Sequence, residues 1–114
     1  MAVIYRGTTP TILYKFRKVD PNRIVEGFLT IRQGPDFKRL VLEKPLSEAT
    51  LGEMTLSWDL TQEETLKLRE KEKGKVYFNY LLDNQKRGVG KELAFDAVTS
   101  GKDEVITYEI SGGN

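Results

Sequence analysis

The 114-residue sequence contains neither cysteine nor histidine. Without cysteine, neither a disulfide framework nor a thiolate zinc site can form. Without histidine, the chain lacks the commonest general base and metal ligand, and no Ser–His or Cys–His nucleophilic arrangement is available. Most hydrolases are therefore disfavoured, and we expect a protein that carries no metal and no cofactor and that is stabilised by packing alone.

Long apolar runs and net charge are also scarce. No stretch approaches the ~18 apolar residues of a membrane span, and residues 1–9 lack the regions of a signal peptide. The 18 basic and 17 acidic residues leave a formal net charge of +1, which provides no field that would select nucleic acid or an anionic membrane. We expect synthesis in a cytoplasm, with no nucleic-acid partner and no membrane partner.

The composition is sufficient for one small core. Hydrophobic residues make up 39% of the chain and charged residues 31%, as in ordinary soluble globular proteins. A chain of this length buries roughly two-thirds of its unfolded surface. A single domain over residues 1–114 is predicted.

The central segment, residues 54–68, reads MTLSWDLTQEETLKL. Its first half alternates apolar and polar residues, which is typical of a strand with one buried face. The alternation predicts a buried set of Met54, Leu56, Trp58 and Leu60.

A short helix near residues 61–70 is predicted to follow this strand. Thr61 and Glu64 have the spacing of a capping box, in which each side chain bonds the backbone N–H of the other residue. Gly74 is predicted to end the helix in a left-handed conformation, and residues 47–49 to form one further helical turn.

The same alternation predicts strands on both sides of this centre, separated by turn signals about every eight to twelve residues. These strands are Ala2–Tyr5, Thr11–Arg17, Ile24–Gln33, Phe37–Glu43, Lys75–Asp83, Val89–Val98 and Glu104–Ser111. With only one helical connection, parallel βαβ units are disfavoured. We predict an all-β antiparallel sandwich of seven to eight strands with one short helix.

The alternation also predicts which side chains are buried. In the strand at 24–33, Val25, Leu29 and Ile31 are expected to point inward, with Gly27 as a bulge or close-approach point. In the later strands the inward sets are Val76, Phe78, Tyr80, Leu82 and Leu93, Phe95, Ala97.

Two loop motifs resemble ligand-binding loops, one for phosphate and one for calcium, but their residues do not fit either. Gly88-Val89-Gly90-Lys91 is not a phosphate-binding loop, because Gln85 stands where the earlier glycine is required and Glu92 follows the lysine. Asp83-Asn84-Gln85 lacks the ligand spacing of a calcium loop. Both are interpreted as parts of a hairpin.

Candidate site residues are few. Two carboxylates facing a cleft would allow glycoside hydrolysis, and Glu43, Glu53, Asp59 and Glu92 are the candidates, but a solvated surface is the preferred interpretation. No catalytic, cofactor-binding or metal residue is therefore predicted.

Aromatic residues offer a different kind of site, because they stack on sugars and bases. Trp58 is interpreted as core. Tyr5 and Tyr77 fall off the apolar alternation and are the better candidates for exposed contacts.

The first strand, Ala2–Tyr5, is apolar and carries no charge that would block pairing at a sheet edge. It is separated from the next strand by Thr8-Thr9-Pro10. Pairing within its own domain and pairing with a neighbouring chain both remain open.

Two segments together resemble a known group: residues 6–11, RGTTPT, and residues 60–65, LTQEET. The chain resembles small proteins encoded in the tail region of phages and prophages of Gram-positive bacteria. The valine-containing strand at 75–82 and the basic hairpin at 86–98 match that group in order. Residues 107–114 extend past its usual end.

The resemblance implies a virion component with an immunoglobulin-like β-sandwich, similar to the N-terminal domain of baseplate upper proteins. Its implied partners are other tail or baseplate proteins, with a homo-oligomer as an open alternative, and it implies no catalysis. A carbohydrate-binding module for host cell-wall glycan is the competing hypothesis. Assembly requires open sheet edges and apolar patches, whereas glycan binding requires outward aromatics beside carboxylates or amides.

Overall fold

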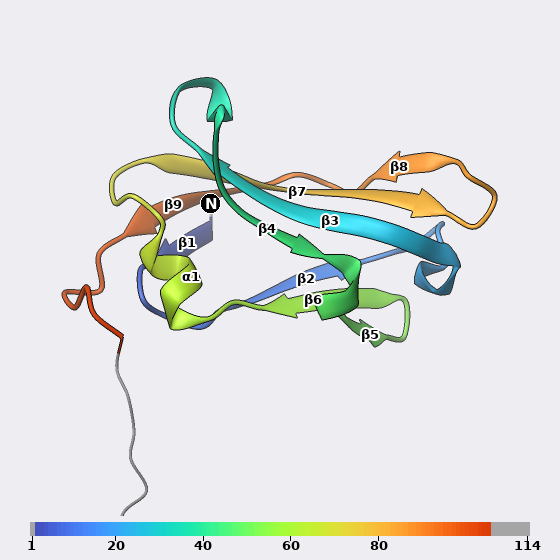
Figure 1. The fold of residues 1–114 in the computed structure, drawn as a ribbon, viewed down its shortest axis with the longest axis horizontal. Helices are drawn as coiled ribbons and strands as arrows, with labels where there is room; N and C mark the ends of the chain where they lie inside the picture. Colours follow the sequence, from blue (N-terminus) through green and yellow to red (C-terminus); the bar gives the residue numbers. More distant parts are fainter. Residues whose placement is uncertain (1, 106–114) are drawn as a thin grey trace, which may run out of the picture.

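The computed structural model describes residues 2–105, in which nine strands form two facing sheets with one short α-helix at one end (Figure 1). The large sheet has the order β1–β9–β7–β3–β4, and β8 also pairs with β7. The small sheet has the order β2–β6–β5.

The elements of the large sheet are β1 (Ala2–Tyr5), β3 (Ile24–Gln33), β4 (Arg39–Pro45), β7 (Lys73–Leu82), β8 (Arg87–Val89) and β9 (Leu93–Val98). Those of the small sheet are β2 (Thr11–Lys15), β5 (Thr50–Gly52) and β6 (Thr55–Asp59). The helix is α1 (Gln62–Leu66), and the 3-10 turns are η1 (Pro21–Arg23), η2 (Pro35–Phe37) and η3 (Leu46–Glu48).

The prediction of a mostly β fold is confirmed, but the prediction of purely antiparallel sheets is wrong. β1 pairs with β9 in parallel, with Ile4 opposite Ala97. A parallel pair needs a long connection rather than a hairpin, and here almost the whole chain lies between the two strands. β1 thus pairs within its own sheet, where Ile4 is buried.

The core lies between the two sheets and is rich in aromatic rings. Trp58 of β6 and Phe78 of β7 are fully buried, with ring centroids 5.0 Å apart, and Tyr14 of β2 lies 5.6 Å from Phe78. Burial raises the pKa of Tyr14 to about 12. The predicted core roles of Leu56, Trp58 and Leu60 are confirmed.

Met54 does not belong to this core. It has a φ of 56° and is 37% exposed, because β6 begins only at Thr55 and the preceding residues turn back from β5. β5 was not predicted, since three residues are too few to show an alternation.

The strand at 24–33 has the predicted bounds, but the set of its buried side chains differs from the predicted one. The pairing of β3 with β7 shifts register between Ile24 and Glu26, so Ile24 is buried while Val25 is 57% exposed. Leu29 and Ile31 are buried as predicted. The close-approach role of Gly27 is confirmed, because a Cβ there would lie 2.8 Å from the Phe78 ring.

Several boundaries differ from the predicted ones. β2 ends at Lys15, β4 begins at Arg39 after the turn η2, and η3 begins one residue earlier than the turn predicted at 47–49. The strand predicted at 89–98 is divided into β8 and β9, although Gly90 N still donates to Phe78 O at 2.7 Å. In the strand predicted at 104–111, Glu104 and Val105 lie outside any strand, and residues 106–111 lie outside the described residues.

The helix ends earlier than predicted, and Gly74 does not end it. Gly74 lies inside β7, where the ring of Phe95 occupies the space that a Cβ would need. Lys71, with a φ of 66°, has the left-handed conformation instead. Buried Gln33 holds the connecting loop, since its Oε1 accepts from Arg69 N at 2.8 Å and its Nε2 donates to Glu72 O at 3.2 Å.

The two segments that carry the family resemblance are in contact. Just past the second segment, Arg6 donates to Leu68 O at 2.6 Å and to Leu66 O at 3.0 Å, which satisfies carbonyls at the end of α1. Thr65 Oγ1 donates to Thr8 O at 2.7 Å. Residues 6–11 and 60–65 therefore form one structural unit.

Candidate functional site

The outer face of the large sheet, which points away from the small sheet, is the best candidate for a functional surface. Within residues 2–105, neither α1 nor any strand covers it (Figure 1). Large apolar side chains that are exposed stand on this face: Val3, Tyr5, Phe28, Leu40, Leu81 and Val89.

Strand register arranges this face into transverse rows. In the first row, Arg87 of β8 lies opposite Leu81 of β7, and Leu81 lies opposite Glu26 of β3. The second row runs in the same way from Val89 through Asn79 to Phe28, and the third from Tyr77 through Thr30 to Glu43.

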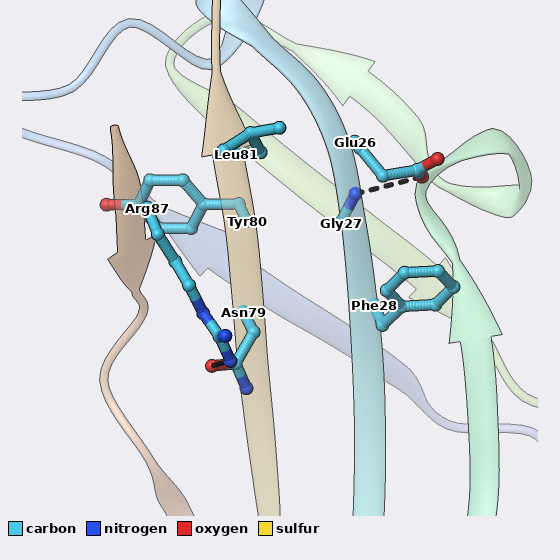
Figure 2. A pocket seen from close by; sticks show the side chains of 7 residues that line it. All are labelled: Glu26, Gly27, Phe28, Asn79, Tyr80, Leu81 and Arg87. Atoms are coloured by element: carbon cyan, nitrogen blue, oxygen red, sulfur yellow. Dashed lines mark hydrogen bonds between the residues drawn. The ribbon is translucent and has the colours of Figure 1, made fainter. Parts of the chain in front are cut away.

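A first hollow of about 240 Å³ lies on the first and second rows. Figure 2 shows Arg87 on one side of it and Glu26 and Phe28 on the other. Arg87 Nη2 donates to Asn79 Oδ1 at 3.1 Å, and Glu26 Oε1 accepts from Gly27 N at 3.1 Å. An apolar centre is thus flanked by opposite charges.

A second hollow of about 230 Å³ adjoins the first and shares Asn79 with it. It is lined by Thr30, Arg32, Glu43, Tyr77 and Asn79. Thr30 Oγ1 donates to Glu43 Oε2 at 3.5 Å. The second hollow therefore places an aromatic ring beside an amide and a carboxylate.

No family model, curated protein or solved structure matches this chain. The outer face and the contact between residues 6–11 and 60–65 therefore carry the functional argument.

The structure does not bring the four candidate carboxylates together. Glu43 lines the second hollow, whereas Asp59 accepts from Thr11 Oγ1 at 2.6 Å on the small sheet. Glu92 pairs with Lys75 at 2.8 Å, and Glu53 is exposed in the turn between β5 and β6. Over residues 2–105, no group of three or more acidic side chains is placed to hold a metal ion.

The two loop motifs are hairpin parts, as predicted. Gly88 lies against the ring of Tyr80, where a Cβ would collide, and Gly90 packs closely against the ring of Tyr14. In the turn at 83–85, Gln85 has a φ of 68° and Asp83 pairs with Arg23 at 2.9 Å. In the part of the chain that the structure describes, no helix has the length and apolar character to cross a membrane.

The aromatic predictions are confirmed in part. Trp58 is core, Tyr5 is 51% exposed on the outer face, and Tyr77 is partly buried beside the second hollow. Sequence reasoning missed Phe28, Asn79 and Arg87, because they come from three different strands. Phe28 carried a usable signal, since it is an apolar residue out of phase with Leu29 and Ile31.

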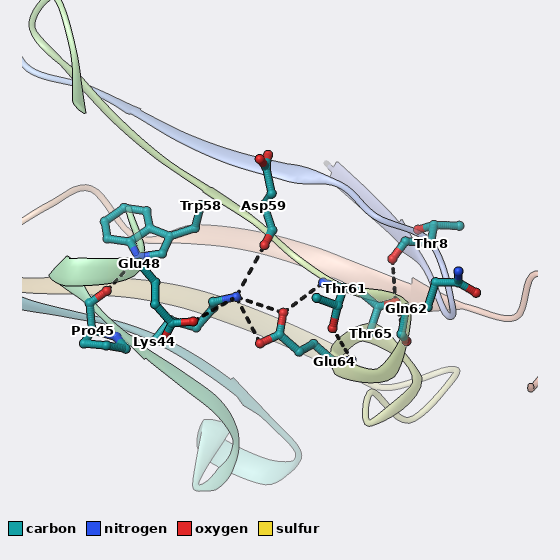
Figure 3. A network of polar contacts seen from close by, with 10 residues as sticks. All are labelled: Thr8, Lys44, Pro45, Glu48, Trp58, Asp59, Thr61, Gln62, Glu64 and Thr65. Atoms are coloured by element: carbon teal, nitrogen blue, oxygen red, sulfur yellow. Dashed lines mark hydrogen bonds and ion pairs between the residues drawn. The ribbon is translucent and has the colours of Figure 1, made fainter. Parts of the chain in front are cut away.

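A buried polar network joins β4 to the start of α1 (Figure 3). Lys44 Nζ, on a residue only 5% exposed, donates to Glu64 Oε1 at 2.9 Å, to Glu64 Oε2 at 3.0 Å and to Asp59 O at 3.3 Å. Burial favours a higher pKa for Glu64, but hydrogen bonds from Thr61 and the Lys44 ammonium outweigh it and hold that pKa below its usual value. The network thus connects β4 and the end of β6 to the start of α1.

The predicted capping box is present within this network. Glu64 N donates to Thr61 Oγ1 at 3.2 Å, and Thr61 N donates to Glu64 Oε1 at 2.8 Å.

Replacing Thr61 with alanine is expected to lower the free energy of unfolding by about 0.5–2 kcal/mol, because the Glu64 N–H loses its acceptor. Urea unfolding followed by circular dichroism measures the change. Thr61→Ser, which keeps the hydroxyl, is the matched control and should stay close to the parent. Equal losses in the two variants would contradict a capping role.

Proposed function

We propose that this chain is a non-enzymatic structural protein of a phage or prophage, a tail or baseplate accessory that acts through contacts with other virion proteins. The observation that carries the proposal is the outer face of the large sheet, with exposed Phe28, Leu40, Leu81 and Val89 left uncovered by the described elements. Exposed apolar surface of this kind is typical of protein interaction sites.

The resemblance to tail-region proteins supports this assignment. Residues 6–11 and 60–65 match that group, and the hydrogen bond from Thr65 Oγ1 to Thr8 O links the two segments. Their residue types therefore serve the fold rather than a reaction. We extend the proposal to an immunoglobulin-like sandwich, supported by the two facing sheets, with the parallel β1–β9 pair as a departure from it.

The location that follows is the virion, after synthesis in the bacterial cytoplasm. Purified virions should contain the chain by mass spectrometry, and electron microscopy with a labelled chain should place it at the tail or baseplate. Its absence from purified virions would refute the assignment.

A pair of leucines tests whether the outer face makes the contact. Leu40→Asp is expected to reduce incorporation into virions, because Leu40 is 49% exposed on the outer face. Leu13→Asp is the matched control, since Leu13 is 47% exposed but belongs to the small sheet. Equal incorporation of both variants would show that another surface makes the contact.

Binding of cell-wall glycan is the second candidate function, and the second hollow favours it. Phe28 lies opposite Asn79, and Tyr77 lines the hollow together with Asn79 and Glu43. Aromatic rings beside polar planar groups are suited to sugar rings and their hydroxyls.

Sedimentation with purified Gram-positive cell walls tests this second function. Glycan binding predicts that the chain sediments with the walls, that Tyr77→Ala and Asn79→Ala each weaken the binding, and that Tyr5→Ala leaves it unchanged. A chain that stays in the supernatant would remove this function.

A further inference from the structure

We infer that the first and second rows of the outer face dock a second copy of this chain, face to face, about a two-fold axis that runs parallel to the strands. The inference rests on the assembly proposal and deepens it by naming one partner of the outer face. The evidence is the distribution of charge and apolar surface over these two rows.

The first row is self-complementary in charge. Arg87 stands at one end, Leu81 at the centre and Glu26 at the other end. An axis above Leu81 and parallel to the strands places Arg87 of each copy over Glu26 of the other. An axis perpendicular to the strands would place Arg87 over Arg87, so the charges select the first arrangement.

The second row is self-complementary in shape under the same axis. Val89, 61% exposed, stands on one side of Asn79, and Phe28, 41% exposed, stands on the other side between Asn79 and Pro45 of β4, beside the first hollow. The axis places Val89 of each copy over Phe28 of the other, so that an exposed side chain meets a hollow of about 240 Å³. Contacts of this kind form the desolvated centre of protein interfaces.

The pairing of Arg87 within its own chain is compatible with this docking. Its Nη2 donates to Asn79 Oδ1, and a guanidinium has five N–H donors, so others remain for a carboxylate. The net charge of +1 causes little long-range repulsion between two copies. Sheets packed face to face keep their strands within about 30° of each other, which the proposed axis satisfies.

Sedimentation equilibrium of the full chain over a range of concentrations tests the inference. The parent is expected to form a dimer. Arg87→Glu and Glu26→Arg should each weaken dimerisation by about tenfold or more, because each creates two like-charge pairs across the axis. The double variant Arg87→Glu with Glu26→Arg should restore the dimer. Val89→Asp should also weaken dimerisation, and neither charge reversal should restore the dimer in that variant.

Matched controls carry the same charge changes on other surfaces. Lys15→Glu on β2 and Glu53→Arg in the turn between β5 and β6 are both at exposed positions. These controls should dimerise like the parent, and circular dichroism melts should show that all variants are folded.

Three results would overturn the inference: a parent that stays monomeric, a double variant as weak as the single ones, or controls that weaken the dimer equally. A monomeric parent that is nevertheless found in virions would overturn the inference of a dimer and leave the proposed function standing. A dimer that is absent from virions would overturn the proposed function and leave the dimer intact.

Discussion

Replacing Trp58 with alanine is expected to lower the free energy of unfolding by about 3–5 kcal/mol. The side chain is fully buried between the sheets, against Phe78 and Tyr14. Its Nε1 also donates to Pro45 O at 3.2 Å, which links the small sheet to β4. Alanine would leave a large cavity, and Pro45 O would lose this donor.

Urea unfolding followed by circular dichroism measures this loss, because Trp58 is the only tryptophan and its fluorescence disappears with it. Trp58→Phe is the informative control, since it keeps an aromatic ring and removes the hydrogen bond, so it should cost less than alanine. Leu51→Ala, at a 51% exposed position, should have little effect. A loss below about 1 kcal/mol for Trp58→Ala, the size of an average substitution, would contradict its central place in the core.

Replacing Lys44 with alanine is expected to cost about 3–5 kcal/mol, because it leaves a partly buried carboxylate without its cation. The Lys44 side chain is 7% exposed and that of Glu64 is 18% exposed. The Asp59 carbonyl loses a donor in the same variant. The pair Lys44→Met with Glu64→Gln removes both charges and should recover much of the loss, so a cycle of these variants should show strong coupling.

The cost of Lys44→Ala should also depend on pH. The pKa of Glu64 is lower in the folded state than its ordinary value of about 4.3. Its carboxylate therefore contributes stability that is complete above the unfolded pKa and is lost as the pH falls through the folded pKa. The difference between the parent and Lys44→Ala should shrink in acid, and a difference independent of pH would assign the loss to packing instead.

Features that depend on neighbouring residues were predictable. The capping box needs only Thr61 and Glu64, three positions apart, and its geometry is as predicted. The alternation at Leu56, Trp58 and Leu60 correctly identified a buried strand face. Such patterns are local because strand and helix periodicities repeat within a few residues.

The candidate site was not predictable in the same way. Arg87, Leu81 and Glu26 form one row only because β8, β7 and β3 are neighbours in the large sheet. The bulge beside Ile24 exposed Val25. Gly74 lies within β7 and leaves space for the ring of Phe95, so it does not end the helix. Each of these three features depends on a contact with a residue more than twenty positions away along the chain.

Local sequence patterns were enough to specify a small mostly β protein, most of its strands, the cap of its helix and the residues of its aromatic core, because these follow from local periodicity and hydrogen bonding. Tertiary structure alone decided the parallel β1–β9 pair, the contact between residues 6–11 and 60–65, and the rows of the outer face. Strand order and register set these features, and both arise from burial of side chains contributed by distant segments.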